Sequence, residues 1–130
     1  MEDCSAMESF FTVSQARELV PAVRAHVEGL VGLRADLVEA QAALRQGREP
    51  AVGGLPEVKA LEARLQEAVD WFGQRAIQVK GLAPVIIDFP SQLDGVSVLL
   101  CWLEGETTLD WYHLAEHGFM GRRRLAEDLD

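Results

Sequence analysis

Almost every side chain that could do chemistry lies in the last third of this 130-residue sequence. The candidate site residues are Asp88, Cys101, Glu104, Glu106, His113, Glu116 and Arg122. One imidazole with two or three carboxylates suits a divalent metal ion, or supplies a base with a shifted pKa. Any site is therefore expected at this end of the chain, and Asp88, Glu106 and His113 would be the working groups of a small metal-dependent or acid–base enzyme.

The same residues also have a purely structural interpretation, which we favour. Asp88 could hold the turn before Pro90, and Glu104 and Glu106 could flank a hairpin. His113 could bind a backbone carbonyl. Polar residues that cluster through turns in the sequence are also typical of solvated loops, so clustering alone does not establish a site.

His113, Glu116 and His117 spell the His-x-x-Glu-His pattern of the inverted zinc proteases. That chemistry needs both histidines on one face of a helix and a distant carboxylate as third ligand. Here Gly118 follows at once, Trp111 and the next residue continue a strand-like pattern, and little chain remains downstream. The pattern is therefore interpreted as a chance match.

Cys101 and Arg122 each have a structural and a functional interpretation. Cys101 lies among leucines, a setting that raises the pKa of a thiol, so packing is favoured over a nucleophile. Arg122 could grip an acidic small molecule, but an ion pair with Asp88 or Glu106 is favoured. A further set of aromatic residues is expected in the core rather than around a pocket: Trp71, Trp102, Trp111 and Phe119.

Two amphipathic helices are predicted ahead of these residues. Apolar residues recur at helical spacing over 14–46, with Ser14 as the cap and Pro21 causing either a kink, which we favour, or a separate short turn. A second helix is predicted over 56–78, with apolar residues as far as Ala76 facing inward. The two helices form an antiparallel hairpin.

The pattern becomes extended after the helices, and three antiparallel strands are predicted over 84–112. Val85–Phe89 begins the first strand, Asp94-Gly95 is a strong hairpin signal, and Val96–Leu103 returns as the central strand. Residues 107–112 alternate as a third strand, and 113–130 is expected to be an irregular C-terminal segment. The predicted fold is α+β: a helical hairpin followed by a three-stranded antiparallel β-meander.

Length and composition limit the classes of protein to which this chain can belong. The length fits a single domain over 1–130, with a disordered tail over 1–10. A net charge of −9 disfavours nucleic acid and anionic membranes as partners. The two cysteines form no disulfide framework, and the N-terminus lacks the pattern of a secretory signal, so a cytoplasmic location is expected.

Several short segments together resemble a known family: Phe11-Thr12-Val13, Ala16, Pro21, Val79-Lys80, Ile87-Asp88-Phe89-Pro90, Asp94-Gly95, Leu99-Leu100-Cys101-Trp102, Gly105-Glu106, His113, Gly118-Phe119 and Gly121-Arg122. In these the chain is similar to the DUF2203 family of small bacterial proteins of unknown function. The resemblance spans most of the chain, with His117 as a departure. It implies no reaction.

The leading functional hypothesis is a non-enzymatic interaction module that self-associates through its helices. Arg34 and Gln41 interrupt the apolar seam of the first helix, as polar residues do where a register or partner number is set. If the apolar seam is wider than one partner helix can cover, a homodimer through the helical hairpins would bury the remainder. No cofactor is identified from the sequence, a divalent metal belongs to the enzyme alternative, and any small-molecule ligand is unspecified.

Overall fold

The structure of the chain is a computed structural model that describes residues 10–47 and 54–126. The predicted tail over 1–10 therefore lies outside the described residues, apart from Phe10. The described part contains two helices followed by five strands and one short 3-10 helix. The predicted α+β class is confirmed, and the details of the sheet differ from the expectation.

The first helix, α2, runs over Val13–Arg45 as a single element. Its cap is Thr12 rather than Ser14. The Thr12 hydroxyl accepts from the Gln15 backbone N–H at 3.0 Å, and the Gln15 side chain accepts from the Thr12 N–H at 2.9 Å. This capping box satisfies two N–H groups that the first turn leaves without partners. Because one helix runs through Pro21, a separate leading turn is wrong, while the kink stays a prediction.

The second helix, α3, runs over Leu55–Gly73 and ends five residues before the predicted boundary. Ala76 has φ of 63°, in the left-handed region, and the Ile77 N–H donates to the Phe72 carbonyl at 3.0 Å. These bonds close the helix and turn the chain into the sheet, so Ala76 lies in the turn and not on a helical face. Neither helix has the length and apolar composition that crossing a bilayer would require, nor does any other described segment.

The sheet has five antiparallel strands in the order of the sequence: β1 (Gln78–Leu82), β2 (Val85–Leu93), β3 (Val96–Leu103), β4 (Trp111–Leu114) and β5 (Arg123–Arg124). The β2–β3 hairpin turns at Asp94 and Gly95, both with positive φ, as the dipeptide predicts. The central position of β3 is confirmed.

Three expectations about the sheet were wrong. β1 begins at the end of the predicted second helix, and residues 107–110 form a loop instead of a strand. The C-terminal segment is not irregular throughout, because it carries a 3-10 helix, η1 (Phe119–Gly121), and β5. The loop has a clear cause: Leu109 is fully buried, and its carbonyl accepts from the Arg17 Nε at 3.0 Å. Both contacts hold this stretch against α2 and away from the β3 edge.

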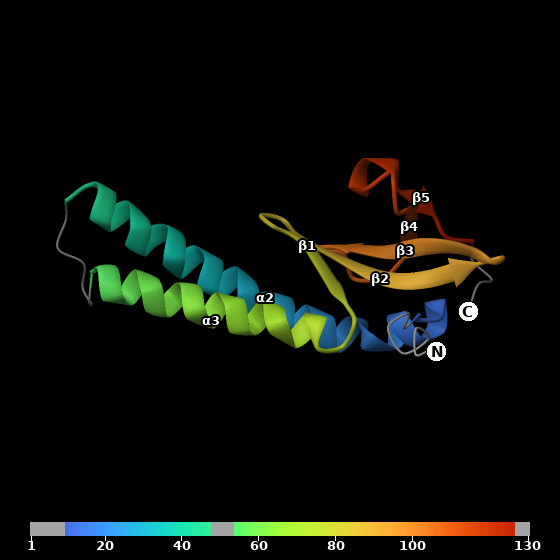
Figure 1. Cartoon of the computed structure of the whole chain (residues 1–130), viewed down its shortest axis with the longest axis horizontal. Helices are drawn as coiled ribbons and strands as arrows, with labels where there is room; N and C mark the ends of the chain where they lie inside the picture. Colours follow the sequence, from blue (N-terminus) through green and yellow to red (C-terminus); the bar gives the residue numbers. More distant parts are fainter. Residues whose placement is uncertain (1–9, 48–53, 127–130) are drawn as a thin grey trace, which may run out of the picture.

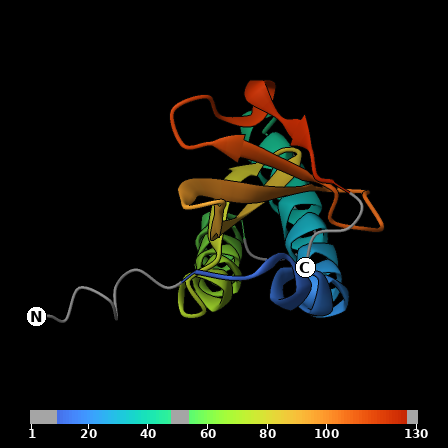
Figure 2. The same cartoon turned by 90° about the vertical axis from the view of Figure 1, so that its right-hand side faces the viewer.

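Figures 1 and 2 show the two helices below the sheet, the sheet itself, and the C-terminal segment with η1 above it, where β5 extends the sheet beyond β4. Side chains alternate between the two faces of the sheet. Ile87, Phe89, Leu100 and Trp102 point toward the helices and are at most 2% exposed. Each such side chain contributes roughly 1.5–3 kcal/mol by its burial. The intervening residues of β2 and β3 face the other way, toward the C-terminal segment.

Arg34 joins the helical layer to the loop after β3. Its Nη1 lies 2.9 Å from Glu104 Oε1 and its Nη2 lies 3.2 Å from Oε2, a two-point contact. Nη1 also donates to the Leu82 carbonyl at 2.6 Å. Arg34 therefore positions the sheet on α2, and its interpretation as a polar break that sets the register of a helical seam was wrong.

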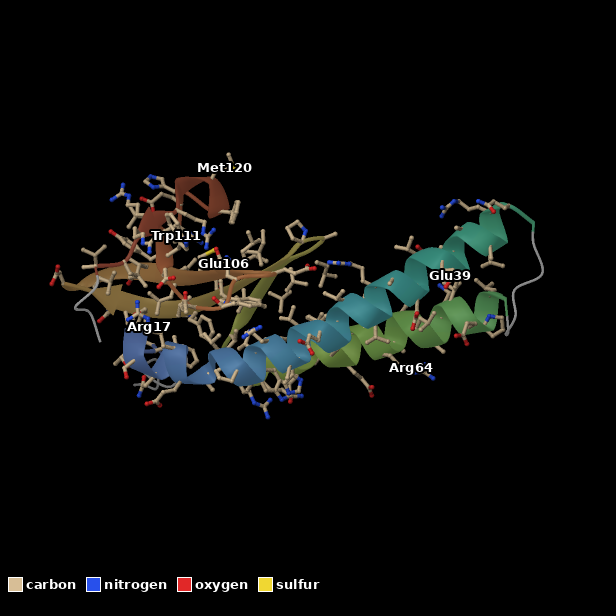
Figure 3. The ribbon with its side chains drawn as sticks, turned by 180° about the vertical axis from the view of Figure 1, so that it is seen from behind. Arg17, Glu39, Arg64, Glu106, Trp111 and Met120 are labelled. Atoms are coloured by element: carbon tan, nitrogen blue, oxygen red, sulfur yellow. The ribbon has the colours of Figure 1, made fainter. Side chains whose placement is uncertain are left out.

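The far half of the helical hairpin extends beyond the sheet (Figures 1 and 3). We call this part, residues 35–45 of α2 and 55–63 of α3, the helical arm. Its two helices pack on each other through residues that include Leu61, which is 3% exposed. Other apolar side chains of the arm remain open, with Val38 58% and Leu55 56% exposed. The sheet covers neither of these residues.

Candidate functional site

Three of the seven candidate residues meet on the upper face of the sheet. Asp88 of β2 lies directly opposite Cys101 of β3, and His113 of β4 lies opposite Leu99, one step along the same face. One ligand atom from each of Asp88, Cys101 and His113 can be chosen so that all three lie within 4.8 Å of one another. Their residues are 1%, 0% and 2% exposed. We call these three residues the polar cluster.

The C-terminal segment covers this face of the sheet, and Arg122 fixes it there. Arg122 Nη2 lies 2.9 Å from both carboxylate oxygens of Glu106 and donates to the Cys101 carbonyl at 3.3 Å. Its guanidinium also lies 4.9 Å from the ring centre of Trp111 and 5.0 Å from that of Phe119. Figure 3 shows Trp111 and Met120 on this side of the sheet. Such contacts explain how a face that could be open to water is buried.

The hydrogen bonds of His113 determine its tautomer. Nδ1 lies 2.8 Å from the Leu114 carbonyl, which can only accept, so Nδ1 carries a proton. Nε2 then faces Asp88 Oδ2 at 3.1 Å. Two acceptors at this distance repel each other unless a positive charge lies between them. Either a proton, carried by the ring or by the carboxyl group, or a metal ion would satisfy both atoms.

Asp88 is the most constrained member of the polar cluster. Its Oδ2 also lies 3.3 Å from Lys80 Nζ, at the end of a side chain that is 45% exposed. Its Oδ1 is buried and has no hydrogen-bond partner within residues 10–47 and 54–126. A buried carboxylate oxygen without a donor costs about 1–3 kcal/mol or more. Asp88 also interacts with the Cys101 thiol through a side-chain hydrogen bond, and its Oδ1 remains an acceptor that a cation could bind.

Cys101 is a thiol, not a thiolate, in this setting. Burial, and next the charge of Asp88, raise its pKa from 9.0 to about 12. A thiol with such a pKa is a poor nucleophile at neutral pH. Because a bound metal ion deprotonates a coordinating thiol outright, the same residue is a competent ligand once a cation is present.

The other candidate residues lie outside the polar cluster. Glu104 bonds to Arg34 and to the Val85 N–H, and these two contacts hold the pKa of its carboxyl below the usual range. Glu106 pairs with Arg122, which confirms the preferred interpretation of that arginine. Glu116 is exposed. The enzyme alternative would need Glu104 and Glu106 to converge with Asp88 and His113; they do not, and Cys101 lies beside Asp88 instead.

Two features of the site differ from the patterns in the sequence. His113 lies in β4, whereas Glu116 and His117 are exposed in the turn that follows, so the three do not share a helical face. This confirms that the His-x-x-Glu-His pattern is a chance match. Lys80 was missed, because the residues between the predicted second helix, which ended at 78, and the predicted meander, which began at 84, were assigned to no strand. The alternation of Gln78, Val79 and Lys80 ahead of the Pro84 turn was the signal for β1.

The aromatic residues separate between the two faces of the sheet. Trp102 is in the core, as expected, whereas Trp111 and Phe119 hold Arg122 on the upper face. Trp71 is half-buried on α3, where His26 stacks on it with ring centres 3.6 Å apart. The stacking shows that His26 packs the two helices together.

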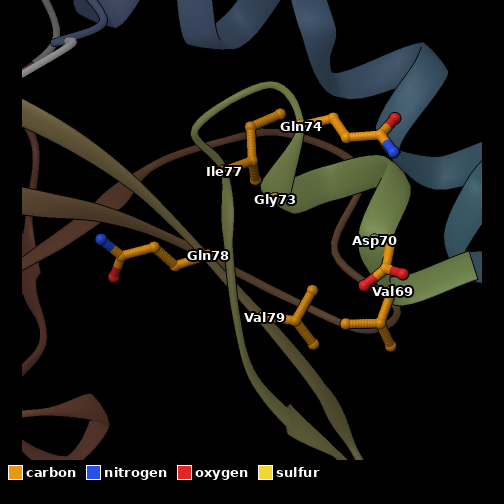
Figure 4. A pocket seen from close by; sticks show the side chains of 7 residues that line it. All are labelled: Val69, Asp70, Gly73, Gln74, Ile77, Gln78 and Val79. Carbon is orange, nitrogen blue, oxygen red and sulfur yellow. The ribbon is translucent and has the colours of Figure 1, made fainter. Parts of the chain in front are cut away.

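A hollow of about 540 Å³ lies between the end of α3 and β1. Figure 4 shows Val69 and Asp70 of α3 on one side of it and Val79 of β1 on the other. Its acidic group is exposed and already accepts from Gln66 Nε2 at 2.9 Å. Apart from that carboxylate its lining is apolar or carries amides, so it offers less chemistry than the polar cluster.

Comparisons with known proteins give a family and no activity. A family model described as an uncharacterized conserved protein, DUF2203, matches residues 9–125, which is most of the chain. No curated protein matches the sequence. No solved structure matches it either. The chemistry that this protein can perform therefore depends on the residues of the polar cluster.

Proposed function

Because this chain belongs to the DUF2203 family of uncharacterized conserved proteins, we propose its function from its own geometry: it binds a divalent transition metal of the zinc class at Asp88, Cys101 and His113. The observation that carries the proposal is the buried meeting of three donor atoms within 4.8 Å, together with the unpartnered Asp88 Oδ1. Buried charges and polar atoms are expected to be paired or to coordinate a metal.

The donor set favours one class of metal. A thiolate, an imidazole and a carboxylate together suit zinc and its borderline-soft neighbours, whereas magnesium and calcium prefer oxygen ligands alone. The bond from His113 Nδ1 to the Leu114 carbonyl supports this assignment, because metal-binding histidines usually donate their other ring N–H to a carboxylate or a backbone carbonyl. This bond orients the ring so that Nε2 faces the Asp88 carboxylate.

The charges of the polar cluster also suit a divalent ion. Asp88 and a deprotonated Cys101 carry two negative charges, which a divalent cation neutralises. Lys80 now supplies positive charge to Asp88 Oδ2, and its half-exposed side chain is long enough to move into water when a cation binds. Neutralisation within the site removes the cost of burying the thiolate.

The burial of all three residues favours a structural role over catalysis. Catalytic zinc sites keep an open position for water or substrate, and structural sites are closed. Asp88 offers two oxygens, so three residues can supply four donors. Such a centre would join β2, β3 and β4 beneath the C-terminal segment, which agrees with a non-enzymatic protein.

Cobalt binding tests the proposal directly. Adding Co²⁺ to the full chain is expected to produce a thiolate-to-cobalt charge-transfer absorption band, because Cys101 is a ligand and cobalt adopts zinc-like sites. Zn²⁺ should abolish the band by competition. Zn²⁺ at about 100 times its dissociation constant should raise the free energy of unfolding by roughly 2.7 kcal/mol, measured by urea denaturation.

The two cysteines provide a matched control. Cys101→Ser should lose the cobalt band, and Cys4→Ser should keep it. A band that depends on Cys4 and not on Cys101, or a Zn²⁺ titration with no change in stability, would contradict a centre at the polar cluster. Mg²⁺ serves as the ion that is expected to have no effect at the same concentration.

A second candidate function is self-association through the helical arm, as proposed from the sequence. Three of the seven exposed large apolar residues of the described chain lie on this arm: Val38, Leu44 and Leu55. The sheet and the C-terminal segment do not reach it (Figure 1). A second copy of the arm would cover these side chains in a symmetric pair.

Sedimentation velocity tests the dimer. The wild-type chain should sediment as a dimer, and the double substitution Val38→Lys with Leu55→Lys should weaken the dimer at least tenfold, or about 1.4 kcal/mol. Val96→Lys is the control, because Val96 is 52% exposed at the opposite end of the molecule. A wild-type monomer at high concentration would rule out self-association.

A further inference from the structure

Three arginines of α2 lie along the loop that joins β3 to β4, residues 104–110. Arg34 binds Glu104 at one end of this loop, and Arg17 binds the Leu109 carbonyl and lies 3.8 Å from Asp110 at the other. Arg24 lies between them on the helix and is exposed. No described residue forms an ion pair or hydrogen bond with Arg24. The middle cation of the row therefore forms no close ion pair within the described chain, and Glu28, one turn further along α2, lines a hollow together with it.

Two hollows open beside Arg24, between α2 and the loop. The first, of about 400 Å³, is lined by Arg17, Arg24 and Asp110 together with the Thr107 and Thr108 side chains. Its two guanidiniums face one carboxylate, so its charge is positive. Val20, Pro21 and Leu109 also line it, and the Thr108 hydroxyl already donates to Asp110, so the guanidiniums are the groups that suit the head of a small anion.

The second hollow, of about 290 Å³, shares Arg24 with the first. Val27, Val31 and Trp102 make its wall apolar. The carboxylates of Glu28 and Glu104 also line it, and Arg34 neutralises the second of these. Because Glu28 would repel a second negative charge, this hollow suits the uncharged part of a ligand.

Trp102 adds an independent observation. It is 2% exposed, it lines the second hollow, and its indole N–H has no acceptor in the described part of the chain. Buried tryptophan N–H groups usually have a partner. The indole N–H is itself buried, so it reports changes at the wall of the second hollow rather than bonding a ligand there.

We propose that these two hollows form one binding site for a small amphipathic carboxylate. Its carboxylate binds Arg24 in the first hollow, and its apolar chain lies along Val27 and Val31 toward Trp102. The site lies on the helix side of the sheet, opposite the polar cluster, and it does not depend on metal binding. The ligand class follows from the two guanidiniums of the first hollow and from the apolar side chains that line both hollows.

Nuclear magnetic resonance of the ¹⁵N-labelled full chain tests the proposal. The three tryptophans give three indole N–H signals, and that of Trp102 is identified by Trp102→Phe or, if that variant does not fold, by elimination with Trp71→Phe and Trp111→Phe. Hexanoate should shift the Trp102 signal in a saturable way. Hexanamide, of the same shape without charge, and acetate, without the chain, should bind at least about tenfold more weakly.

Arg24→Gln should weaken hexanoate binding at least about tenfold, because it removes the charge that recognises the carboxylate. Arg64→Gln is the matched control on α3 (Figure 3) and should leave binding unchanged. An immobile Trp102 signal, equal binding of hexanamide, equal binding of acetate, or an unaffected Arg24→Gln variant would each overturn the proposal. Hexanoate should bind equally well with a metal chelator present; loss of binding would overturn the independence of the two sites.

Discussion

Replacing His113 with alanine should lower the free energy of unfolding of the metal-free protein by about 3 kcal/mol. His113 lies 3.1 Å from Asp88 Oδ2, and both residues are buried. Without the ring, the carboxylate keeps only Lys80 as a cationic partner, and Oδ1 still has no donor in the described chain. The loss stays at the lower end of the 3–5 kcal/mol typical of a broken buried pair, because Lys80 remains. Urea denaturation with a chelator measures it.

His117→Ala is the control for this measurement. His117 is exposed in the turn after β4, so its removal should change the stability by less than about 0.5 kcal/mol. If His113→Ala also changed the stability by less than 1 kcal/mol, Asp88 would not need a cation beside it. The charge argument for the polar cluster would then fail, together with its strongest link to a metal.

Local patterns in the sequence predicted the elements that local forces dominate. The first helix was predicted within one residue at each end, because its apolar spacing persists over the whole length of α2. The β2–β3 hairpin followed from Asp94-Gly95, whose backbone readily adopts the positive φ that a tight hairpin turn needs. These signals involve residues that are close in the sequence, so no knowledge of the tertiary structure was required.

The elements that depend on distant contacts were not predictable in the same way. The loop over 104–110 is held by Arg17 and Arg34, which come from a helix about seventy to ninety residues earlier. β5 pairs with β4 through only two residues, too few to leave a pattern. The end of α3 depends on Ala76 in a left-handed conformation, which alanine rarely adopts.

Two of the three residues of the polar cluster could have been placed together from the sequence. A two-residue turn fixes the register of a hairpin, so residues equally distant from Asp94 and Gly95 face each other. Asp88 and Cys101 are each six positions from that turn, and they are paired in the sheet. His113 could not be placed this way, because its register depends on the long loop before β4. The enzyme hypothesis therefore grouped Asp88 with Glu106, whereas the structure pairs Asp88 with Cys101.

Cys101 should make the metal-free protein less stable as the pH rises above about 9. The folded chain holds the thiol proton up to a pKa of about 12, whereas the unfolded chain releases it near 9.0. Between these values the native state binds more protons than the unfolded state, so the free energy of unfolding falls with rising pH. The slope is about 1.4 kcal/mol for each pH unit, or about 4 kcal/mol over the full window.

The difference between two proteins isolates this effect from the lysines and Tyr112, which titrate in the same range. Both carry Cys4→Ser, and one also carries Cys101→Ala; each is unfolded in urea at pH 8, 9, 10 and 11 with a chelator present. The parent should lose stability relative to Cys101→Ala at every step above pH 9. A constant difference in stability between the two proteins would mean that the Cys101 thiol has the same pKa in the folded and unfolded states. Burial and the charge of Asp88 would then be too weak to keep the thiol protonated.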